Sequence, residues 1–229
     1  MTEPTLAQPP PRRLGAHVFE TLVVVVIALA VAALVRAFVV QAFYIPSGSM
    51  ENTLLVDDRI AVSKLSAVFG DAERGDIVVF RDPGGWLDRP PGATNPVRRF
   101  LEFVGVAPSS TEGDLVKRVI GVGGDHVECC DKQGRVLVNG VPLDETYLYP
   151  GDVPSLEKFD VTVPAGSLWV MGDHRSASED SRAQPKNHQF VPETDVIGRA
   201  MLVFWPVGQW DLLKRPDTFA DIPDTEAKR

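Results

Sequence analysis

A long apolar stretch near the N-terminus limits how this chain can fold. Every residue in 22–35 is apolar, and four more apolar residues follow Arg36. Counted from Val18 to Val40, the segment would form about 34 Å of helix, which exceeds the roughly 30 Å of a bilayer's hydrocarbon core. The sequence therefore predicts a transmembrane anchor helix over 18–40.

Basic residues flank this stretch mainly on one side. Arg12 and Arg13 precede it, whereas no Lys or Arg lies between Arg36 and Arg59. By the positive-inside rule, we expect 1–17 to be a cytoplasmic tail and the remainder to lie outside a bacterial cell membrane crossed once. A cleaved signal peptide is the alternative, but the small-x-small sites lie inside the apolar run, which favours an uncleaved anchor.

Beyond the anchor the sequence predicts mainly β structure, in one extracytoplasmic domain over 41–215. Short runs rich in Val and Ile are separated by Gly, Pro, Asp and Asn. Asn139-Gly140 between two valines predicts a tight type I′ hairpin. The expected strands are 59–65, 76–80, 115–122, 126–130, 135–138, 167–171 and 198–205.

Three further segments carry other expectations. Residues 97–106 place their apolar side chains on one helical face, which is either core or a patch at the membrane surface. The charged, proline-containing residues 216–229 predict a flexible tail. The adjacent Cys129 and Cys130 are either ordinary strand residues or, in an oxidising compartment, a strained and redox-labile disulfide.

The overall composition excludes some classes of protein. A net charge of −8 argues against a nucleic-acid binder, which would normally carry a basic face. Apolar residues make up 44% of the chain, enough for a folded core. The cysteine and histidine spacing matches no zinc motif, so we expect no metal and no cofactor.

Reactive residue types gather in three segments: a serine turn at 46–50, the predicted strand with Lys117, and residues 172–182. A serine hydroxyl is a weak nucleophile unless a neighbouring group takes its proton. Lysine can do so only when neutral, which requires a pKa lowered by several units through desolvation. Lys117 lies among apolar residues in a predicted strand, so one face there could be dry.

Other interpretations of these residues remain open. His174 follows Asp173, and His188 is nearby, so a Ser-His-Asp arrangement is the main chemical competitor. Neighbouring residues on a strand point to opposite faces, however, so Asp173 and His174 would not form a dyad by themselves. Opposite charges two residues apart favour ion pairs between Asp173 and Arg175 and between Asp180 and Arg182.

Together these segments resemble bacterial type I signal peptidase, a membrane-anchored Ser-Lys endopeptidase. The resemblance covers nearly the whole chain beyond residue 17, and five motifs in sequence behind an anchor are highly specific. These motifs are Pro46-Ser47-Gly48-Ser49-Met50, Asp58-Arg59, Arg74-Gly75-Asp76, Lys117-Arg118-Val119-Ile120-Gly121 with Gly124-Asp125, and Gly172-Asp173 through Ser178, Asp180, Ser181 and Arg182.

The resemblance implies a role for each matching residue. Ser49 would be the nucleophile and Lys117 the general base, and Ser47 would join the Ser49 N–H in the oxyanion hole. Ser178 would orient the lysine, while Asp180 and Arg182 would brace the site. The positions that would line shallow pockets for small substrate side chains at −1 and −3 are Phe43, Ile45, Pro46, Met50, Leu54, Leu115 and Val116.

The resemblance also implies a fold and partners. We expect a signal-peptidase/repressor-protease-like β-fold with one N-terminal transmembrane helix and a variable β-insert at about 126–166. His174, Ser176 and Ala177 depart from residues that are often amide or acidic in the family. Secretory preproteins with signal peptides, the lipid bilayer and the protein-export machinery are the expected partners. The rivals are a self-cleaving repressor-type protease and a membrane-anchored β-domain that binds exported proteins without cutting them.

Overall fold

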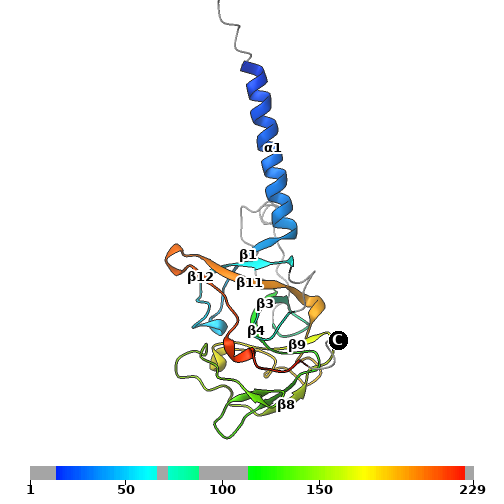
Figure 1. The fold of residues 1–229 in the computed structure, drawn as a ribbon, viewed down its shortest axis with the longest axis vertical. Coiled ribbons are helices and arrows are strands. Elements are labelled where there is room, and N and C mark those ends of the chain that lie inside the picture. The colour runs from blue at the N-terminus through cyan, green and yellow to red at the C-terminus, as the bar shows by residue number, and fades with distance from the viewer. Residues whose placement is uncertain (1–13, 66–71, 88–112, 225–229) are drawn as a thin grey trace, which may run out of the picture.

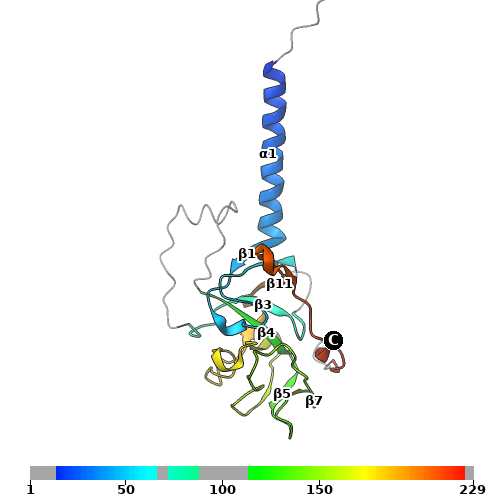
Figure 2. The same cartoon turned by 90° about the vertical axis from the view of Figure 1, so that its left-hand side faces the viewer.

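A computed structural model describes residues 14–65, 72–87 and 113–224 of the chain. A single long helix, α1 (Leu14–Phe38), projects from one end of a domain built mainly of β strands (Figure 1). The second view, turned by 90°, shows strands β5 and β7 at the end of the domain opposite α1 (Figure 2). The mainly β class predicted from the sequence is confirmed.

Helix α1 covers most of the range predicted as a membrane anchor. Within the described residues, however, no helix is long and apolar enough to cross a membrane. The transmembrane helix predicted over 18–40 is therefore not confirmed. The amphipathic segment predicted over 97–106 lies outside the described residues.

The larger sheet contains the strands that carry the candidate site. In the described part of the chain it has eight strands, in the order β1-β2-β11-β3-β4-β9-β10, with β12 paired to β11. All the registered pairs in it are antiparallel. The strands are β1 (Val40–Tyr44), β2 (Arg59–Ser63), β3 (Ile77–Arg81), β4 (Asp114–Val122), β9 (Ser167–Met171), β10 (Val191–Pro192), β11 (Val196–Trp205) and β12 (Asp211–Leu212).

Strand β4 is interior to this sheet and is buried on both faces. It pairs with β3 on one side and β9 on the other, and the residues from Lys117 to Val122 are all buried. Side chains alternate between faces along a strand. Val119 packs in one apolar cluster and Ile120 in another, so each face of β4 has its own core. Lys117 is thus placed in a dry environment by its neighbours.

A second, smaller sheet has the order β7-β6-β5-β8 in the described residues. The predicted hairpin is confirmed here: Val138 pairs with Val141, and Asn139 and Gly140 have φ of 53° and 78°. A type I′ turn needs positive φ at both central positions, which Asn-Gly tolerates. The strands are β5 (His126–Cys129), β6 (Val136–Val138), β7 (Val141–Pro142) and β8 (Phe159–Thr162).

All seven strands predicted from the sequence are present, with ends shifted by a few residues. Strands β1, β8, β10 and β12 were not predicted, and β7 was implied only as the second half of the Asn139-Gly140 hairpin. Only Val40 of β1 was counted with the predicted anchor, and β10 and β12 have two residues each. Five short 3-10 helices complete the described elements: η1 (Gly48–Met50), η2 (Arg175–Ala177), η3 (Glu193–Asp195), η4 (Val207–Gln209) and η5 (Asp217–Phe219).

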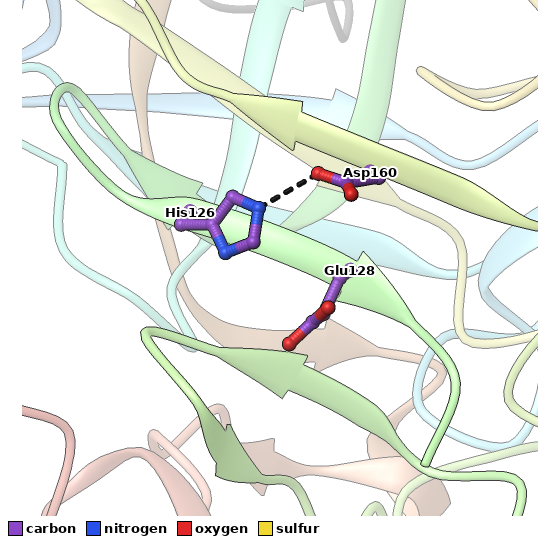
Figure 3. Close-up of side chains that lie close together, drawn as sticks. All are labelled: His126, Glu128 and Asp160. Atoms are coloured by element: carbon purple, nitrogen blue, oxygen red, sulfur yellow. Dashed lines mark hydrogen bonds and ion pairs between the residues drawn. The ribbon is translucent and has the colours of Figure 1, made fainter.

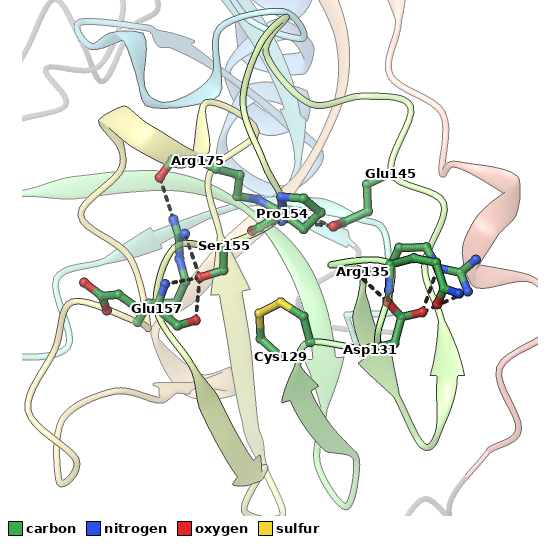
Figure 4. The surroundings of a disulfide bond; sticks show 11 residues. Cys129, Asp131, Arg135, Glu145, Pro154, Ser155, Glu157 and Arg175 are labelled. Atoms are coloured by element: carbon green, nitrogen blue, oxygen red, sulfur yellow. Dashed lines mark hydrogen bonds and ion pairs between the residues drawn. A yellow bond between two sulfur atoms is a disulfide. The ribbon is translucent and has the colours of Figure 1, made fainter.

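Cys129 and Cys130, at the end of β5, are joined to each other by a disulfide in this structure (Figure 4). Figure 4 also shows the bonds between Arg135 and Asp131 in the turn that follows. Of the two states that the sequence left open, the structure therefore contains the bonded one. Both cysteines pack against the core cluster of the smaller sheet.

The segment 216–224 differs from the flexible tail that the sequence predicts. Phe219 and Ile222 are only 7% and 6% exposed and pack in the core cluster around Ile120 and Val127. The guanidinium of Arg74 donates to the carbonyl oxygens of Ile222 and Pro223. Two apolar side chains at the right spacing therefore outweigh the charged and proline-rich composition on which the prediction rested.

We predict that Phe219→Ala lowers the free energy of unfolding by about 3 kcal/mol, because it removes a large buried ring and leaves a cavity. Urea unfolding of the full chain in detergent, followed by tryptophan fluorescence, measures this change. Leu156→Ala is the matched control, since Leu156 is 85% exposed. Equal midpoints for the two variants would mean that the segment does not pack as described.

Candidate active site

The serine turn is held at the end of the β1–β2 pair. Strand β1 ends at Tyr44, and Ile45 exchanges backbone hydrogen bonds with Asp57 and Asp58 across the loop. The 3-10 helix η1 then carries Ser49, and Leu54 N–H donates to the Met50 carbonyl at 2.7 Å. Ile45, Met50 and Leu54 are buried, so both flanks of the turn are anchored in the core.

Ser49 and Lys117 meet although 68 positions separate them in the sequence. Lys117 Nζ lies 2.6 Å from Ser49 Oγ, within strong hydrogen-bond distance. The serine is 8% and the lysine 3% exposed. The pairing of a buried amine with a hydroxyl on a constrained turn fits an activated nucleophile and its base.

Burial changes the acid–base chemistry of the lysine. Desolvation lowers the pKa of Lys117 to about 8, and the negative charges of Asp180 and Asp173 oppose this shift. At pH 7 a group with that pKa is neutral in about one molecule in ten, against about one in three thousand for an amine with a pKa of 10.5. A fraction of Lys117 is therefore neutral near neutral pH, which is the condition that a lysine base must meet.

The second serine of the turn lies beside the first. Ser47 Oγ is 3.4 Å from Ser49 Oγ, and Ser47 is exposed with an extended backbone before η1. The structure thus brings together the serine pair and the lysine that the sequence singled out. The position of Ser47 at the solvent side of Ser49 is compatible with contact to a bound substrate.

The third segment, 172–182, packs behind the serine turn. Asp180 is fully buried, and its Oδ2 accepts a hydrogen bond from Gly172 N–H at 3.0 Å. Arg182 donates to both oxygens of Asp180 at 2.8 Å, which confirms the predicted ion pair. Burial alone would raise the pKa of Asp180, but the bonds from Arg182 hold that pKa below its ordinary value.

Ser178 lies close to these groups. Its Oγ is buried and makes no hydrogen bond of normal geometry within the described residues, although its proximity to the Asp180 carboxylate helps to lower the pKa of that group. The bond from Ser178 to Lys117 that the resemblance implies is therefore not present in this structure. Its proximity to the site is clear from Gly172, where an added Cβ would overlap both Ser178 Oγ and the Ser49 carbonyl oxygen.

A buried ion pair joins β4 to the third segment. Arg118 Nε and Nη2 donate to the two oxygens of Asp173 at 2.8 and 2.6 Å, and Arg118 Nη1 donates to the Gly75 carbonyl at 2.9 Å. Thr53 Oγ1 donates to Asp173 at 2.5 Å, and this bond connects the residues just after the serine turn to the same ion pair. The guanidinium also lies 4.2 Å from the centre of the Tyr147 ring.

The predicted pairing of Asp173 with Arg175 is wrong. Arg175 instead bonds to Glu145, from the loop between β7 and β8 of the smaller sheet, and Figure 4 shows the two side chains facing each other. The prediction assumed strand spacing, but η2 begins at Arg175 and turns its side chain away. Arg118 and Glu145 are the partners that the sequence could not indicate, because they are distant in the chain.

The histidine route to catalysis has no support in the geometry. His174 Nδ1 lies 3.2 Å from the Gly48 carbonyl oxygen and 3.2 Å from Glu51 Oε2. Ser49 Oγ is instead held by Lys117. His188 takes part through its backbone: its N–H donates to the Pro185 carbonyl, and its carbonyl accepts a hydrogen bond from Trp86 Nε1.

One group in the described residues has ligand types suited to a metal ion. The ligand atoms of His126, Glu128 and Asp160 lie within 4.8 Å of one another on strands β5 and β8 (Figure 3). His126 Nε2 is already engaged by Asp160 Oδ1 at 2.7 Å. Both partners are well exposed, and the group lies on the smaller sheet, whereas Lys117 lies on the larger one. We interpret it as a hydrogen-bonded pair across two strands, with Glu128 beside it.

The side chains expected to line substrate pockets do not all lie together. Phe43, Ile45, Met50 and Leu54 are at most 2% exposed and share one apolar cluster, against which Val116 packs. Leu115 packs against a different cluster, on the other face of β4. Pro46 is exposed at the start of the turn. The first five thus form a continuous apolar region next to Ser49.

The chain is similar to known proteins over most of its length. The model of the family "Signal peptidase, peptidase S26" matches residues 18–205. Signal peptidase I of Mycobacterium tuberculosis (strain H37Rv) is 40% identical over 222 residues, covering 85% of this chain and 75% of that protein. Signal peptidase I of Leptolyngbya laminosa is 34% identical, covering 95% and 93%. A solved signal peptidase I from Enterococcus faecalis aligns over 56% of this chain and 95% of its own at 25% identity, with a TM-score of 0.37.

The matching family is one of serine peptidases, and the site holds a serine on a fixed turn in contact with a buried lysine. The family model covers most of the chain, and the curated relatives match it over most of their own lengths. The chain therefore belongs to the bacterial type I signal peptidases of peptidase family S26, and is a serine peptidase.

We predict that Gly172→Ala reduces peptidase activity by about a hundredfold. The new Cβ would overlap Ser178 Oγ and the Ser49 carbonyl, so the serine turn must shift, and a displacement of about 1 Å in an active site can cost that much. Steady-state cleavage of a precursor protein measures it. The control is Gly208→Ala, where an added Cβ meets nothing within 4 Å. Wild-type activity in Gly172→Ala would contradict the packing described here.

Proposed function

We propose that this chain is a membrane-bound endopeptidase that removes N-terminal signal peptides from exported preproteins. The observation that carries the proposal is the 2.6 Å contact between the buried Lys117 Nζ and Ser49 Oγ. The relatives named signal peptidase I support the choice of substrate. Cleavage would follow small residues at the −1 and −3 positions.

The proposed reaction is acyl transfer. Neutral Lys117 takes the proton of Ser49, and Ser49 Oγ attacks the carbonyl carbon after the −1 residue. The peptide bond breaks as protonated Lys117 gives that proton to the leaving amine, so that Lys117 is neutral again and an ester to Ser49 remains. Lys117 then activates a water molecule that hydrolyses the ester and restores the serine hydroxyl. Each step needs only groups that the site holds, plus water.

The surrounding groups have supporting roles in this proposal. Ser47 Oγ and the Ser49 N–H would stabilise the developing oxyanion, and one such donor is commonly worth a few kcal/mol in the transition state. Asp180 and Arg182 would brace the segment behind the turn, and Ser178 would orient the lysine once substrate closes the site. The apolar region around Phe43, together with Pro46 and Val116, would supply shallow pockets that exclude bulky side chains. Leu115 would contribute only from the other face of β4.

The membrane location rests on the sequence and the family. We propose that 18–40 anchors the chain, because 22–35 is uninterrupted apolar sequence and Arg12 and Arg13 precede it. The N-terminus would then be cytoplasmic and the catalytic domain extracytoplasmic, in a bacterial cell membrane. Such an anchor would hold Ser49 near the exit of a signal peptide from the bilayer, where the export machinery delivers it.

We predict that Ser49→Ala and Lys117→Ala each lower the cleavage rate by about four orders of magnitude or more, since one removes the nucleophile and the other its base. Incubation of a secretory precursor with the full chain in detergent, followed by mass analysis of the shortened product, measures this. Lys132→Ala is the matched control, because Lys132 is exposed on a turn of the smaller sheet.

The same incubation separates the rival functions. A non-catalytic β-domain that binds exported proteins would retain the precursor intact, and a self-cleaving protease would shorten this chain instead. Normal turnover by folded Ser49→Ala or Lys117→Ala would reject the assignment of the two residues. The absence of any product from the wild-type chain would reject the proposed function itself.

A further inference from the structure

His174 contacts the serine turn from two directions. Its backbone N–H donates to the Ser49 carbonyl at 3.1 Å. Its ring Nδ1 lies 3.2 Å from the Gly48 carbonyl oxygen. The side chain is only 16% exposed, so these contacts are largely shielded from competing water. A single residue therefore holds two consecutive carbonyl groups of η1.

The partners of the ring settle where its proton lies. Nδ1 faces a carbonyl oxygen and, at 3.2 Å, the carboxylate of Glu51. Both are acceptors, so Nδ1 must carry a hydrogen, in either the neutral Nδ1–H tautomer or the charged imidazolium. The ring is thus a donor to Gly48 and is unsuited to accept the proton of Ser49 through that nitrogen.

Glu51 holds the same carbonyl from the other side. Its backbone N–H donates to the Gly48 oxygen at 3.0 Å. Its carboxylate packs over Gly48, where an added Cβ would meet Glu51 Oε1 at 2.9 Å. Glycine at position 48 lets the carboxylate reach across the turn to His174. The Gly48 carbonyl therefore has two donors, one fixed by the backbone and one by a side chain.

Fixing this carbonyl also fixes the N–H that the proposed reaction needs. The carbonyl of Gly48 and the N–H of Ser49 belong to one planar trans peptide unit and point in opposite directions. Any rotation of that plane would move both groups together. The donors on the Gly48 oxygen therefore aim the Ser49 N–H toward the opposite side of the turn.

The ring itself is held by a tyrosine from the region predicted as an insert. Tyr149 stacks on His174 with ring centroids 3.9 Å apart and planes 13° from parallel. The Tyr149 N–H donates to the Asp173 carbonyl at 3.0 Å, next to the buried Arg118 pair. The orientation of the imidazole is therefore set by stacking as well as by its hydrogen bonds.

We propose that His174 and Glu51 form a positioning pair that clamps the Gly48 carbonyl and so aims the Ser49 N–H at the oxyanion. This inference rests on the proposed function. It gives His174 a task at a position where the sequence departs from the amide or acidic residues common in the family. An asparagine there would also offer an N–H in place of Nδ1, which provides the test with a rescue.

Two substitutions separate the hydrogen bond from the packing. His174→Phe keeps a ring to stack on Tyr149 but removes the donor, whereas His174→Asn keeps a donor but removes the stacked ring. We expect His174→Phe to lower kcat by about ten- to a hundredfold with KM within about twofold, because the oxyanion contact forms only in the transition state. We expect His174→Asn to retain at least about a third of the wild-type kcat. His188→Ala is the control, since His188 is exposed.

Cleavage of a secretory precursor by the full chain in detergent, with thermal unfolding of each variant, decides the matter. The predicted ranking with equal unfolding temperatures supports the clamp. An active His174→Phe, or an inactive but folded His174→Asn, overturns it, because stacking and not donation would then matter. If the wild type cleaves and both variants match it, the inference fails alone; if the wild type does not cleave, the proposed function fails first.

Discussion

The burial of one amine beside one hydroxyl is the constraint on which the candidate site depends. Lys117 is 3% exposed in the middle of a sheet, and its Nζ lies 2.6 Å from Ser49 Oγ. Taking an ammonium group out of water disfavours its charged form, and here the pKa falls to about 8. A surface lysine at the same distance would remain protonated near neutral pH and would not serve as a base.

The rest of the local structure keeps this arrangement in place without supplying a carboxylate directly to the lysine. The Asp173 carboxylate accepts hydrogen bonds from Arg118 and Thr53, and the Asp180 carboxylate accepts them from Arg182 and the Gly172 N–H. Both acids therefore act on Lys117 only from a distance, where they raise its pKa less than burial lowers it. Buried carboxylates that are paired with other groups can stabilise the structure around the site without keeping Lys117 in its protonated form.

Local patterns were enough to predict seven of the strands and the Asn139-Gly140 hairpin, whereas the Ser49–Lys117 pair was predicted from the family resemblance. The strands have a clear apolar periodicity, and the pair belongs to motifs that resemble a known family. The partners of Asp173 and Arg175 could not be predicted, since Arg118 and Glu145 come close only when β4 and the loop after β7 are folded. The packing of Phe219 was missed because a charged composition hid two anchoring side chains.

The contacts of His174 were also not predictable from the sequence, because they depend on residues that are distant in the chain. In the sequence its neighbour Asp173 made a catalytic interpretation possible, but the fold directs the ring to Gly48 and Glu51. The serine turn is therefore held by contacts from Lys117 on β4 and from His174, both of which are distant from the turn in the sequence. Their common effect is to fix the geometry of η1, while the proposed chemistry is assigned to Ser49 and Lys117.

A direct titration of Lys117 tests whether burial lowers the pKa of its side chain. The side-chain nitrogen shift of this lysine can be followed by NMR in lysine-labelled full-length protein, with Lys117→Arg used to assign the signal. If desolvation lowers the pKa of Lys117 as described, the midpoint lies at about pH 8. A midpoint near 10.4, the value of an unperturbed lysine, would contradict the proposed role of Lys117 as a base. The lysine would then be charged in almost every molecule near neutral pH.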